Sequence, residues 1–202
     1  MLLKSTVDKN PIKQFAKWYE EVLKSGITEP TAVTLATATK TGVPAARTVL
    51  LKGYDEKGFL FFTNYESRKG RELSENPFAE LLFYWMDLHK QVRISGKVEK
   101  VSKEESEKYF KTRPLNSRIG AWASKQSEII PDREYLEKQF SEFMEKYSER
   151  EDVPLPPFWG GYRLVPGRFE FWQGRENRLH DRICYMKKNG GKGEWEIVRL
   201  AP

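Results

Sequence analysis

The stretch TAVTLATATKTGVPAARTVLLKGYDEKGFLFFTNY, residues 31–65, decides which class of fold the chain adopts. It holds three runs rich in β-branched and aromatic residues, at residues 31–39, 44–54 and 58–65, and Thr-Gly and Lys-Gly pairs separate them. Such runs, punctuated by turn residues, are typical of consecutive β-strands. Because no regular alternation with helices is visible, the stretch favours a mainly β fold: an antiparallel barrel with attached helices.

Helices are predicted on both sides of these strands. The first, about residues 11–25, has Asn10 or Asp8 as its cap, Pro11 at its first position and Gly26 after its end. Further helices are predicted at residues 66–77, 102–113 and 133–147. Strands return at residues 78–87 and 90–101, and from Gly160 to the terminal WEIVRLAP. We expect a single domain over residues 1–202, with VPLPP (153–157) as an internal connector and C-terminal strands at about 158–202.

The predicted strand FAELLFYWMD (78–87) is apolar on both faces. Leu81, Phe83 and Trp85 alternate with Leu82, Tyr84 and Met86. The inside of a small barrel covers one face, so a helix or a second subunit must cover the other. A homodimer is the economical explanation.

Composition narrows the range of partners. The chain has a net charge of +6 and a sequence pI of about 9.2, so nucleic acid, a membrane surface or a phosphorylated small molecule is a plausible partner. Its single cysteine, Cys184, excludes an intrachain disulfide framework and suits a reducing compartment. No signal peptide and no long apolar run is visible, so we expect a soluble, cytoplasmic protein.

The segment FWQGRENRLHDR (171–182) concentrates cationic groups. If it is extended, Arg178, His180 and Arg182 share one face, while Leu179 and Asp181 point the other way. Three such groups on one face indicate an anionic ligand, although a solvated strand face explains the pattern equally simply.

A second basic cluster lies at a predicted helix start. Ser67 is a good N-cap, which places Arg68 and Lys69 in the first turn against the helix dipole. Free amides and two cations at a helix N-terminus form a phosphate site, while a basic surface helix start is the simpler alternative.

Two further pairs stand out. Arg47 and Lys52 bracket a strand, and alternation puts them on opposite faces unless a bulge or a strand end intervenes. Tyr109 and Arg113 lie four apart on one helix face, before Pro114. The sequence contains no HExxH or cysteine pair for a metal, and no Walker loop, GxGxxG or GxSxG motif. Cys184 lies in a predicted strand, where burial is commoner than catalysis.

These features together resemble the pyridoxine (pyridoxamine) 5′-phosphate oxidase family. The resemblance spans nearly the whole chain in family order, and EFWQG followed by RLHDR is its most specific part. The matching segments are RTVLLK (47–52), FFTNYESRKG (61–70), KQVRISG (90–96), RPLNSRIGAWASKQS (113–127), FWGGYR (158–163), EFWQGRENRLHDR (170–182) and RLAP (199–202).

The resemblance implies an FMN-binding split β-barrel with Greek-key topology and a homodimer with FMN between its subunits. It also implies that the C-terminal strands, at about 158–202, serve dimerisation. It implies FMN contacts from Arg47, Thr48, Val49, Leu50, Leu51, Lys52, Phe62, Thr63, Arg68, Lys69, Gln91, Trp172 and Arg182, and from Gln126 and Ser127 of the partner chain. Lys52, Tyr109, Arg113 and Ser117 would hold the substrate phosphate. Arg178 and His180 would border the substrate ring as the catalytic pair.

The implied reaction oxidises pyridoxine 5′-phosphate or pyridoxamine 5′-phosphate to pyridoxal 5′-phosphate, with dioxygen as the acceptor and peroxide as the product. It belongs to the biosynthesis and salvage of vitamin B6. Two alternatives stay open: another split-barrel FMN-dependent reductase, and a non-enzymatic anion- or nucleic-acid-binding module. The short segment before Ile12 carries no assigned substrate contact.

Overall fold

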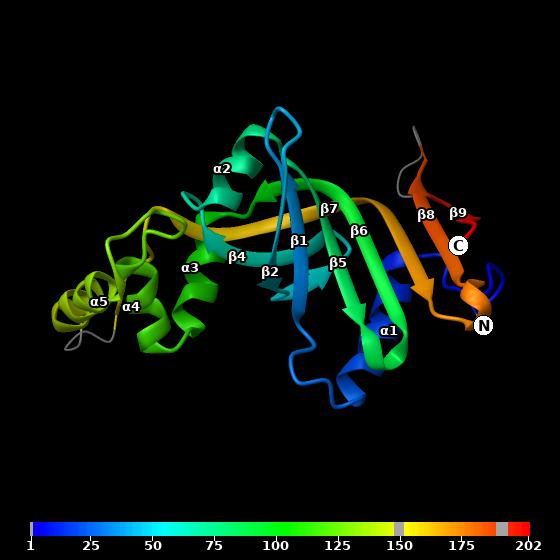
Figure 1. The fold of residues 1–202 in the computed structure, drawn as a ribbon, viewed down its shortest axis with the longest axis horizontal. Coiled ribbons are helices and arrows are strands. Elements are labelled where there is room, and N and C mark those ends of the chain that lie inside the picture. Colours follow the sequence, from blue (N-terminus) through cyan, green and yellow to red (C-terminus); the bar gives the residue numbers. More distant parts are fainter. Residues whose placement is uncertain (1, 148–151, 189–193) are drawn as a thin grey trace.

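The computed structural model describes residues 2–147, 152–188 and 194–202. Figure 1 shows the order and arrangement of their helices and strands. The elements are α1 (Pro11–Lys24), β1 (Ala32–Ala38), β2 (Pro44–Leu50), β3 (Gly53–Asp55), β4 (Gly58–Asn64), α2 (Arg68–Glu75), β5 (Phe78–Trp85), η1 (Met86–Leu88), β6 (Lys90–Lys100), α3 (Lys103–Thr112), α4 (Leu115–Ala123), α5 (Arg133–Tyr147), β7 (Trp159–Gln173), η2 (Glu176–Arg178), β8 (Asp181–Lys187) and β9 (Trp195–Arg199).

The strands form one curled antiparallel sheet. Its order is β2-β1-β5-β6-β7-β4-β3, with β8 paired to β7 and β9 paired to β8. Neighbouring strands are antiparallel in each of these ladders. The predicted antiparallel sheet with attached helices is therefore confirmed, as are the three consecutive strands at residues 31–65.

Strand β7 pairs with three other strands, β4, β6 and β8, and therefore links the two parts of the sheet. One of its edges pairs with β6 along nearly its whole length, while the other pairs first with β4 and then with β8. The β4 ladder ends at Leu164 and the β8 ladder begins at Arg168. Pro166 lies in this gap and has no N–H to donate, so it is tolerated where this edge lacks a partner strand. The second edge of β7 thus divides between two hairpins.

Helix α1 fills the concave side of the sheet. Asn10 caps it by accepting hydrogen bonds from the amides of Ile12 and Lys13, as predicted, and Pro11 opens it. Its buried face includes Phe15, which lies 4.9 Å from Phe59 between ring centroids, and Trp18, which lies 5.2 Å from Phe171. This aromatic packing fixes the curvature of the sheet against the helix.

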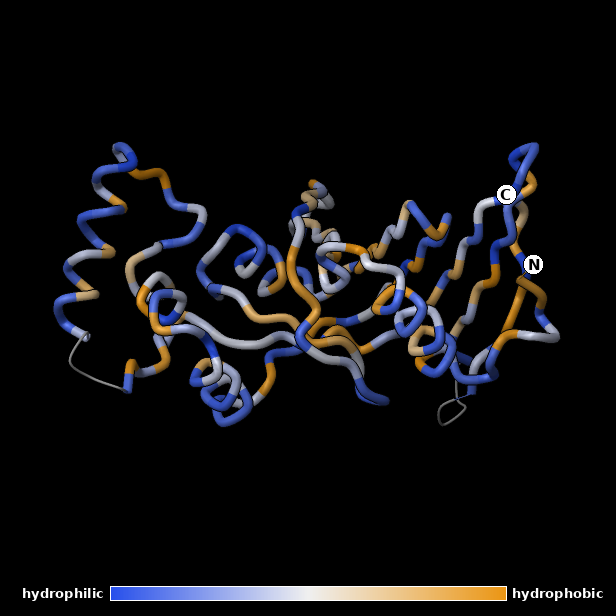
Figure 2. The backbone as a smooth tube through the Cα atoms, turned by 90° about the horizontal axis from the view of Figure 1, so that it is seen from below, coloured by the Kyte–Doolittle hydropathy of each residue, from blue (hydrophilic) through white to orange (hydrophobic). Residues whose placement is uncertain are grey.

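A second core lies under the helices at the other end of the molecule. Phe110 of α3, Ile119 of α4 and Tyr147 of α5 pack around Trp159, the first residue of β7. Figures 1 and 2 place α5 at the end of the molecule opposite both termini. The two cores lie toward opposite ends of β7, so this strand connects them.

The predicted helix boundaries agree closely with the structure. Ser102 caps α3 by accepting a hydrogen bond from the Glu105 amide, and α5 covers residues 133–147 as expected. The face of β5 that carries Leu81, Phe83 and Trp85 is buried, whereas the opposite face is partly exposed to solvent: Tyr84 is 54% exposed in the single chain. No helix in the described residues combines the length and the apolar character needed to cross a membrane.

Candidate functional site

A cleft of about 650 Å³ lies between β2, β4 and the starts of α2 and α4, and we call it the Arg47 cleft. It brings together twelve of the residues that the sequence predicted for the site. These are Arg47, Thr48, Val49, Leu50, Lys52, Phe62, Thr63, Lys69, Tyr109, Arg113, Ser117 and Gln126. Asn64, Thr112, Pro114 and Trp159 complete its lining.

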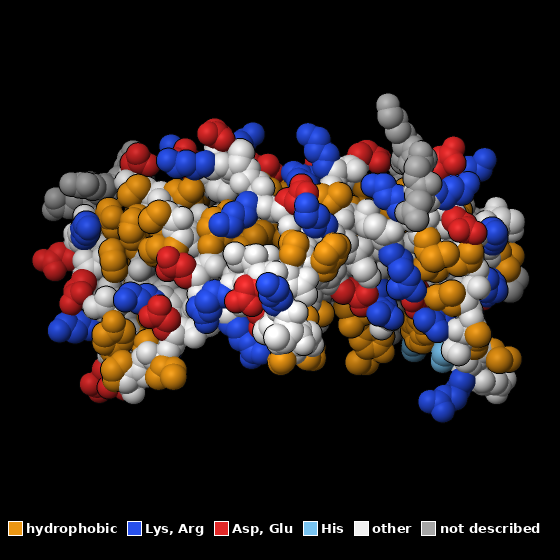
Figure 3. All heavy atoms as spheres, turned by 90° about the horizontal axis from the view of Figure 1, so that it is seen from above, with side chains coloured by type: hydrophobic (Ala, Val, Ile, Leu, Met, Phe, Trp, Pro, Cys, Tyr) orange, Lys and Arg blue, Asp and Glu red, His pale blue; other side chains and the backbone are white. Residues whose placement is uncertain are grey.

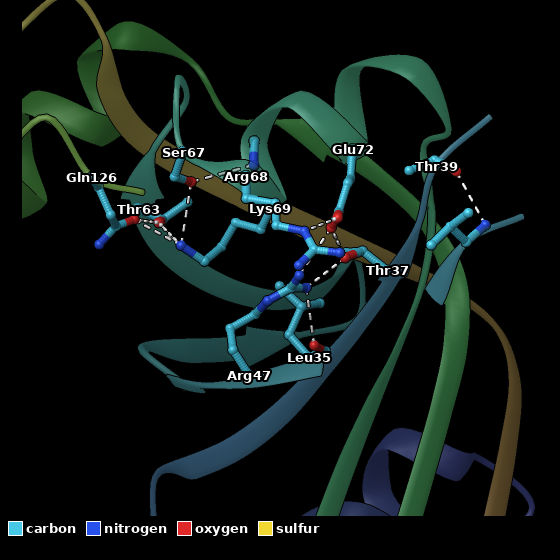
Figure 4. A network of polar contacts seen from close by, with 12 residues as sticks. Leu35, Thr37, Thr39, Arg47, Thr63, Ser67, Arg68, Lys69, Glu72 and Gln126 are labelled. Carbon is cyan, nitrogen blue, oxygen red and sulfur yellow. Dashed lines mark hydrogen bonds and ion pairs between the residues drawn. The ribbon is translucent and has the colours of Figure 1, made fainter. Parts of the chain in front are cut away.

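The start of α2 supplies a buried cation to this cleft. Ser67 caps the helix by accepting a hydrogen bond from the Gly70 amide, which confirms the predicted N-cap. Lys69 is only 8% exposed, and its Nζ lies 2.7 Å from Gln126 Oε1, 3.1 Å from Thr63 Oγ1 and 3.3 Å from Ser67 Oγ (Figure 4). Burial, followed by repulsion from Arg47, lowers the pKa of Lys69 to about 8. The ammonium group is held by neutral oxygens alone, an arrangement suited to an anionic ligand.

A buried carboxylate joins the two neighbouring arginines. Arg47 Nη2 donates to Glu72 Oε2 at 2.9 Å, and Arg68 Nε donates to Glu72 Oε1 at 2.8 Å (Figure 4). Arg47 Nη1 also donates to the Leu35 carbonyl and the Thr37 hydroxyl. Both guanidinium groups are therefore fixed by the protein itself.

An aromatic stack forms another wall of the cleft. The Phe62 ring lies 3.9 Å from the Tyr109 ring and 5.7 Å from the Trp159 ring, with near-parallel planes. The Arg113 guanidinium lies over the Trp159 ring at 4.7 Å. Arg113 Nη1 is buried and has no hydrogen-bond partner among the described residues. A buried N–H without an acceptor is costly, so this atom points to an anionic ligand in the cleft.

The expected difficulty with Arg47 and Lys52 is resolved by a strand end. Strand β2 stops at Leu50, so Lys52 follows the strand and lines the same cleft as Arg47. Pro114 likewise ends α3 and caps a new helix, α4, on which Ser117 lies. Tyr109 and Arg113 both line the cleft, although α3 ends at Thr112 and Arg113 is its C-cap with extended backbone, so the two do not share a helix face as predicted.

The remaining predicted residues lie near the far end of β7. Gln91, Trp172 and Arg182 face each other in register across β6, β7 and β8. Trp172 and His180 line a second hollow of about 710 Å³, which we call the Trp172 hollow. The two rings lie 4.8 Å apart, and His180 Nδ1 accepts a hydrogen bond from the Arg175 amide at 3.1 Å.

One sequence-based expectation about this end is wrong. Residues 178–182 are not a continuous strand, because Arg178 belongs to η2 and β8 begins only at Asp181. Asn177 and Arg178 have φ values of 55° and 61°, in the left-handed region. Arg178, His180 and Arg182 therefore do not share a strand face. Arg178 is exposed, whereas Arg182 donates to Glu170 Oε1 at 2.9 Å and to the Ala201 carbonyl.

Four other predicted FMN contacts need correction or qualification. Gln126 was expected from the partner chain, but it reaches Lys69 of its own chain. Ser127 has φ 72° and lines a different hollow, beside Trp122 and Ile129. Leu51 is 5% exposed in the main core, and Arg68 contributes through Glu72 without lining the cleft.

Sequence reasoning missed Glu72, Thr37 and Trp159. The spacing of Arg68 and Glu72, four apart on a predicted helix, was the available signal for Glu72. The roles of Thr37 and Trp159 depend on contacts distant in sequence, and local patterns do not contain them. In the residues that the structure describes, no group of three His, Cys, Asp or Glu side chains could hold a metal ion.

Comparisons with known proteins agree with this geometry. A family model described as Pyridoxamine 5'-phosphate oxidase matches residues 19–147, and one described as Pyridoxine 5'-phosphate oxidase C-terminal dimerisation region matches residues 159–202. A pyridoxine/pyridoxamine 5'-phosphate oxidase of Trichormus variabilis is 57% identical over 196 residues, covering 97% of this chain and 90% of that protein.

Solved structures share the fold. PhzG from Burkholderia lata, in complex with tetrahydrophenazine-1-carboxylic acid, has a TM-score of 0.91 at 32% identity, covering 100% of this chain and 98% of that one. A pyridoxamine 5'-phosphate oxidase-related, FMN-binding protein from Nostoc punctiforme has a TM-score of 0.74 at 18% identity, covering 95% and 97%. The predicted split β-barrel fold is therefore confirmed.

Proposed function

Because this chain belongs to the pyridoxamine 5'-phosphate oxidase family, we propose that it oxidises pyridoxine 5′-phosphate or pyridoxamine 5′-phosphate to pyridoxal 5′-phosphate. Dioxygen is the electron acceptor and hydrogen peroxide the second product. The observation that carries the proposal is the buried Nη1 of Arg113, which has no hydrogen-bond partner among the described residues and lies in a cleft that also holds Lys52, Tyr109 and Ser117. This set is suited to a substrate phosphate, because a guanidinium and an ammonium bind phosphate oxygens strongly.

FMN is the cofactor, and the residues of the Arg47 cleft fit it. Arg47, Arg68 and Lys69 surround the start of α2, where free amides and the helix dipole add to the attraction for the flavin phosphate. When bound, FMN supplies the two-electron acceptor for oxidation at C4′ of the substrate and is reoxidised by dioxygen. The protein contributes orientation and charge, and it uses no nucleophile.

The separation of the two site regions along β7 supports a site shared between two chains. Trp159 lines the Arg47 cleft and Trp172 lines the Trp172 hollow, thirteen residues further along β7. Thirteen residues of extended strand span up to roughly 43 Å, which is longer than a flavin mononucleotide. Figure 1 shows β7 running along the sheet between these regions. We propose a homodimer in which Gln91, Trp172 and Arg182 of one subunit complete the flavin site on the other, with Arg178 and His180 beside the substrate ring.

A mixing experiment tests this composite site. Lys69→Ala removes a group from the cleft, and Trp172→Ala removes one from the hollow, so each homodimer should lose both of its sites. Mixed and re-equilibrated subunits should regain roughly a quarter of wild-type activity, because half of the dimers are then mixed and each has one intact site. Failure of the mixture to recover any activity would show that both regions act within one chain.

The reaction itself is tested by an aerobic assay. The yellow purified protein is supplied with each phosphorylated vitamer, and pyridoxal 5′-phosphate and peroxide are followed together. We expect equal amounts of the two products. Reduction of a substrate at the expense of a nicotinamide, without peroxide, would favour the alternative of a split-barrel reductase.

A second substrate class comes from the likeness to PhzG. That structure holds tetrahydrophenazine-1-carboxylic acid, a fused-ring carboxylic acid without a phosphate. In this chain the cations at Lys52 and Arg113 favour a phosphorylated substrate instead. The same aerobic assay with a dihydro- or tetrahydrophenazine carboxylic acid decides between the two.

The alternative of a nucleic-acid-binding module is not favoured. Figure 3 shows Lys and Arg side chains interspersed with Asp and Glu on the face that it displays, without a continuous basic stripe. Two predictions remain proposals: a single domain over residues 1–202, supported by the pairing of β7 with both β4 and β6, and a cytoplasmic location, which rests on the single Cys184.

A further inference from the structure

Glu72 is a buried acid in the middle of a site built for an anion. It lies in the second turn of α2 and is 4% exposed. Its Oε2 accepts hydrogen bonds from the Thr37 hydroxyl and from Arg47 Nη2, and its Oε1 accepts one from Arg68 Nε (Figure 4). A negative charge beside a phosphate site weakens the attraction for an anionic ligand. Its presence therefore indicates that Glu72 has another role.

The hydrogen bonds show what that task is. Each carboxylate oxygen holds a different arginine, so one side chain fixes two guanidinium groups that come from separate elements, β2 and α2. Arg47 keeps its Nε–H, and Arg68 keeps both of its terminal nitrogens, without a hydrogen-bond partner among the described residues. These remaining donors are available to a ligand.

The charge count gives a second reason. Arg47, Arg68 and Lys69 carry three positive charges and Glu72 carries one negative charge, which leaves a net +2. A phosphate monoester carries about −1.5 to −2 near neutral pH, so the cluster matches it. Burial raises the pKa of Glu72, but hydrogen bonds from Thr37, Arg68 and Arg47 outweigh it and hold the pKa below its usual value. The carboxylate therefore stays ionised.

We propose that Glu72 is a positioning residue that orients Arg47 and Arg68 toward the flavin phosphate and balances the charge of the cluster before the ligand arrives. This inference rests on the proposed binding of FMN in the Arg47 cleft. The two arginines donate to different oxygens of Glu72, and glutamine replaces one of those oxygens by an NH₂ group, so the arginine that faces the NH₂ group loses its acceptor. One guanidinium then loses its anchor, even though the repulsive charge has been removed.

The test uses two flavins that differ only in the phosphate. Apoprotein of the wild type and of Glu72→Gln is titrated with FMN and with riboflavin, and flavin fluorescence reports binding. We expect the Kd for FMN to rise by about tenfold or more in the variant, the effect of losing one charge-assisted hydrogen bond. We expect the Kd for riboflavin to stay within about twofold, because riboflavin has no phosphate to be gripped.

Glu80→Gln is the matched control. Glu80 accepts hydrogen bonds from an arginine, Arg93, and a hydroxyl, Ser95, as Glu72 does, but Arg93 does not line the Arg47 cleft, whereas Arg47 does. Its substitution should leave the ratio of the two Kd values unchanged. Glu72→Asp provides a second variant, since it keeps the charge but is too short to reach both arginines. It should weaken FMN binding selectively even if Glu72→Gln fails to fold.

The outcomes separate the two hypotheses. Unchanged or tighter FMN binding by Glu72→Gln, with a wild type that binds FMN, would overturn the positioning role alone. Equal weakening of FMN and riboflavin would reduce Glu72 to a structural residue and also overturn it. A wild-type protein that binds neither flavin would overturn the proposed function and this inference together.

Discussion

The Arg47 cleft and the Trp172 hollow differ in how completely one chain builds them. In the cleft, Arg47, Arg68 and Lys69 are each held by acceptors of the same chain. Arg178 lies in sequence between Glu176 and His180, which line the hollow. Its side chain is exposed and makes no hydrogen bond or ion pair with any described residue, and its backbone is left-handed. The cations near the start of α2 are thus held in place by the chain itself, whereas no hydrogen bond or ion pair within the described residues holds the Arg178 side chain. Substitution of Arg68 and Lys69 should accordingly weaken flavin binding, whereas substitution of Arg178 should mainly slow turnover.

The largest effect is expected from the double variant Arg68→Ala/Lys69→Ala. Two charge-assisted contacts to the flavin phosphate are lost, each worth about 1.5–3 kcal/mol, so FMN affinity should fall at least about a hundredfold. The protein should purify folded but largely colourless, as judged by flavin absorbance and circular dichroism. Arg71→Ala on the same helix is the control, because Arg71 is exposed and donates to the Glu66 carbonyl. Full flavin content in the double variant would place the phosphate elsewhere.

A smaller effect, confined to substrate, is expected from Arg113→Met. The guanidinium over Trp159 is replaced by an apolar chain, so kcat/KM for a phosphorylated vitamer should fall roughly 10- to 100-fold while flavin is retained. The unphosphorylated vitamer should be affected little, which separates loss of phosphate binding from general damage. Lys111→Met, an exposed neighbour on α3, is the control. Flavin loss in Arg113→Met would move this residue from the substrate to the cofactor.

Much of the cleft was predictable because it is built from local signals. Ser67 with Arg68 and Lys69, and the break at Pro114, depend on helix capping and on proline, which short segments encode. Arg178 was misplaced because simple alternation assumes extended backbone. Gly174 and Asn177 are residues typical of turns, and they indicated that this segment is not a continuous strand. The position of Gln126 beside Lys69 joins residues 57 apart in sequence, and only the tertiary packing determines it.

Substitution of Arg178 tests the segment between Glu176 and His180 of the hollow, with an expected effect of about tenfold. Arg178→Ala should keep its yellow colour, and its kcat/KM should fall about tenfold because about one charge-assisted contact to the substrate is lost. Arg182→Ala should instead have a lower FMN occupancy, and excess FMN should restore part of its activity. Lysine at position 178 should rescue only partly, because it lacks the planar fork. Arg178→Gly relaxes the left-handed backbone without restoring the side chain, so it should resemble Arg178→Ala. Loss of flavin in Arg178→Ala, with Arg182→Ala fully active, would reverse the two assignments.

The smallest expected effect is a pH dependence of FMN affinity, which should arise from Lys69 of the Arg47 cleft. Burial and Arg47 lower the pKa of Lys69 to about 8 in the free protein, and a bound phosphate raises that pKa again by favouring the charged amine. Binding therefore takes up a proton, and FMN affinity should fall a few-fold as the pH rises from 7 to 9.5. Riboflavin affinity should not change with pH, and Lys69→Arg should remove the pH dependence of FMN affinity.

The stability of the apoprotein should instead rise with pH over the same range. The unfolded chain, with a lysine pKa near its usual 10.5, binds more protons than the folded chain between pH 8 and 10.5. Parallel flavin titrations and urea unfolding across this range measure both trends. FMN affinity that is flat up to pH 9.5 would mean that Lys69 does not touch the phosphate, and that its ammonium group serves only to hold Gln126, Thr63 and Ser67 in place.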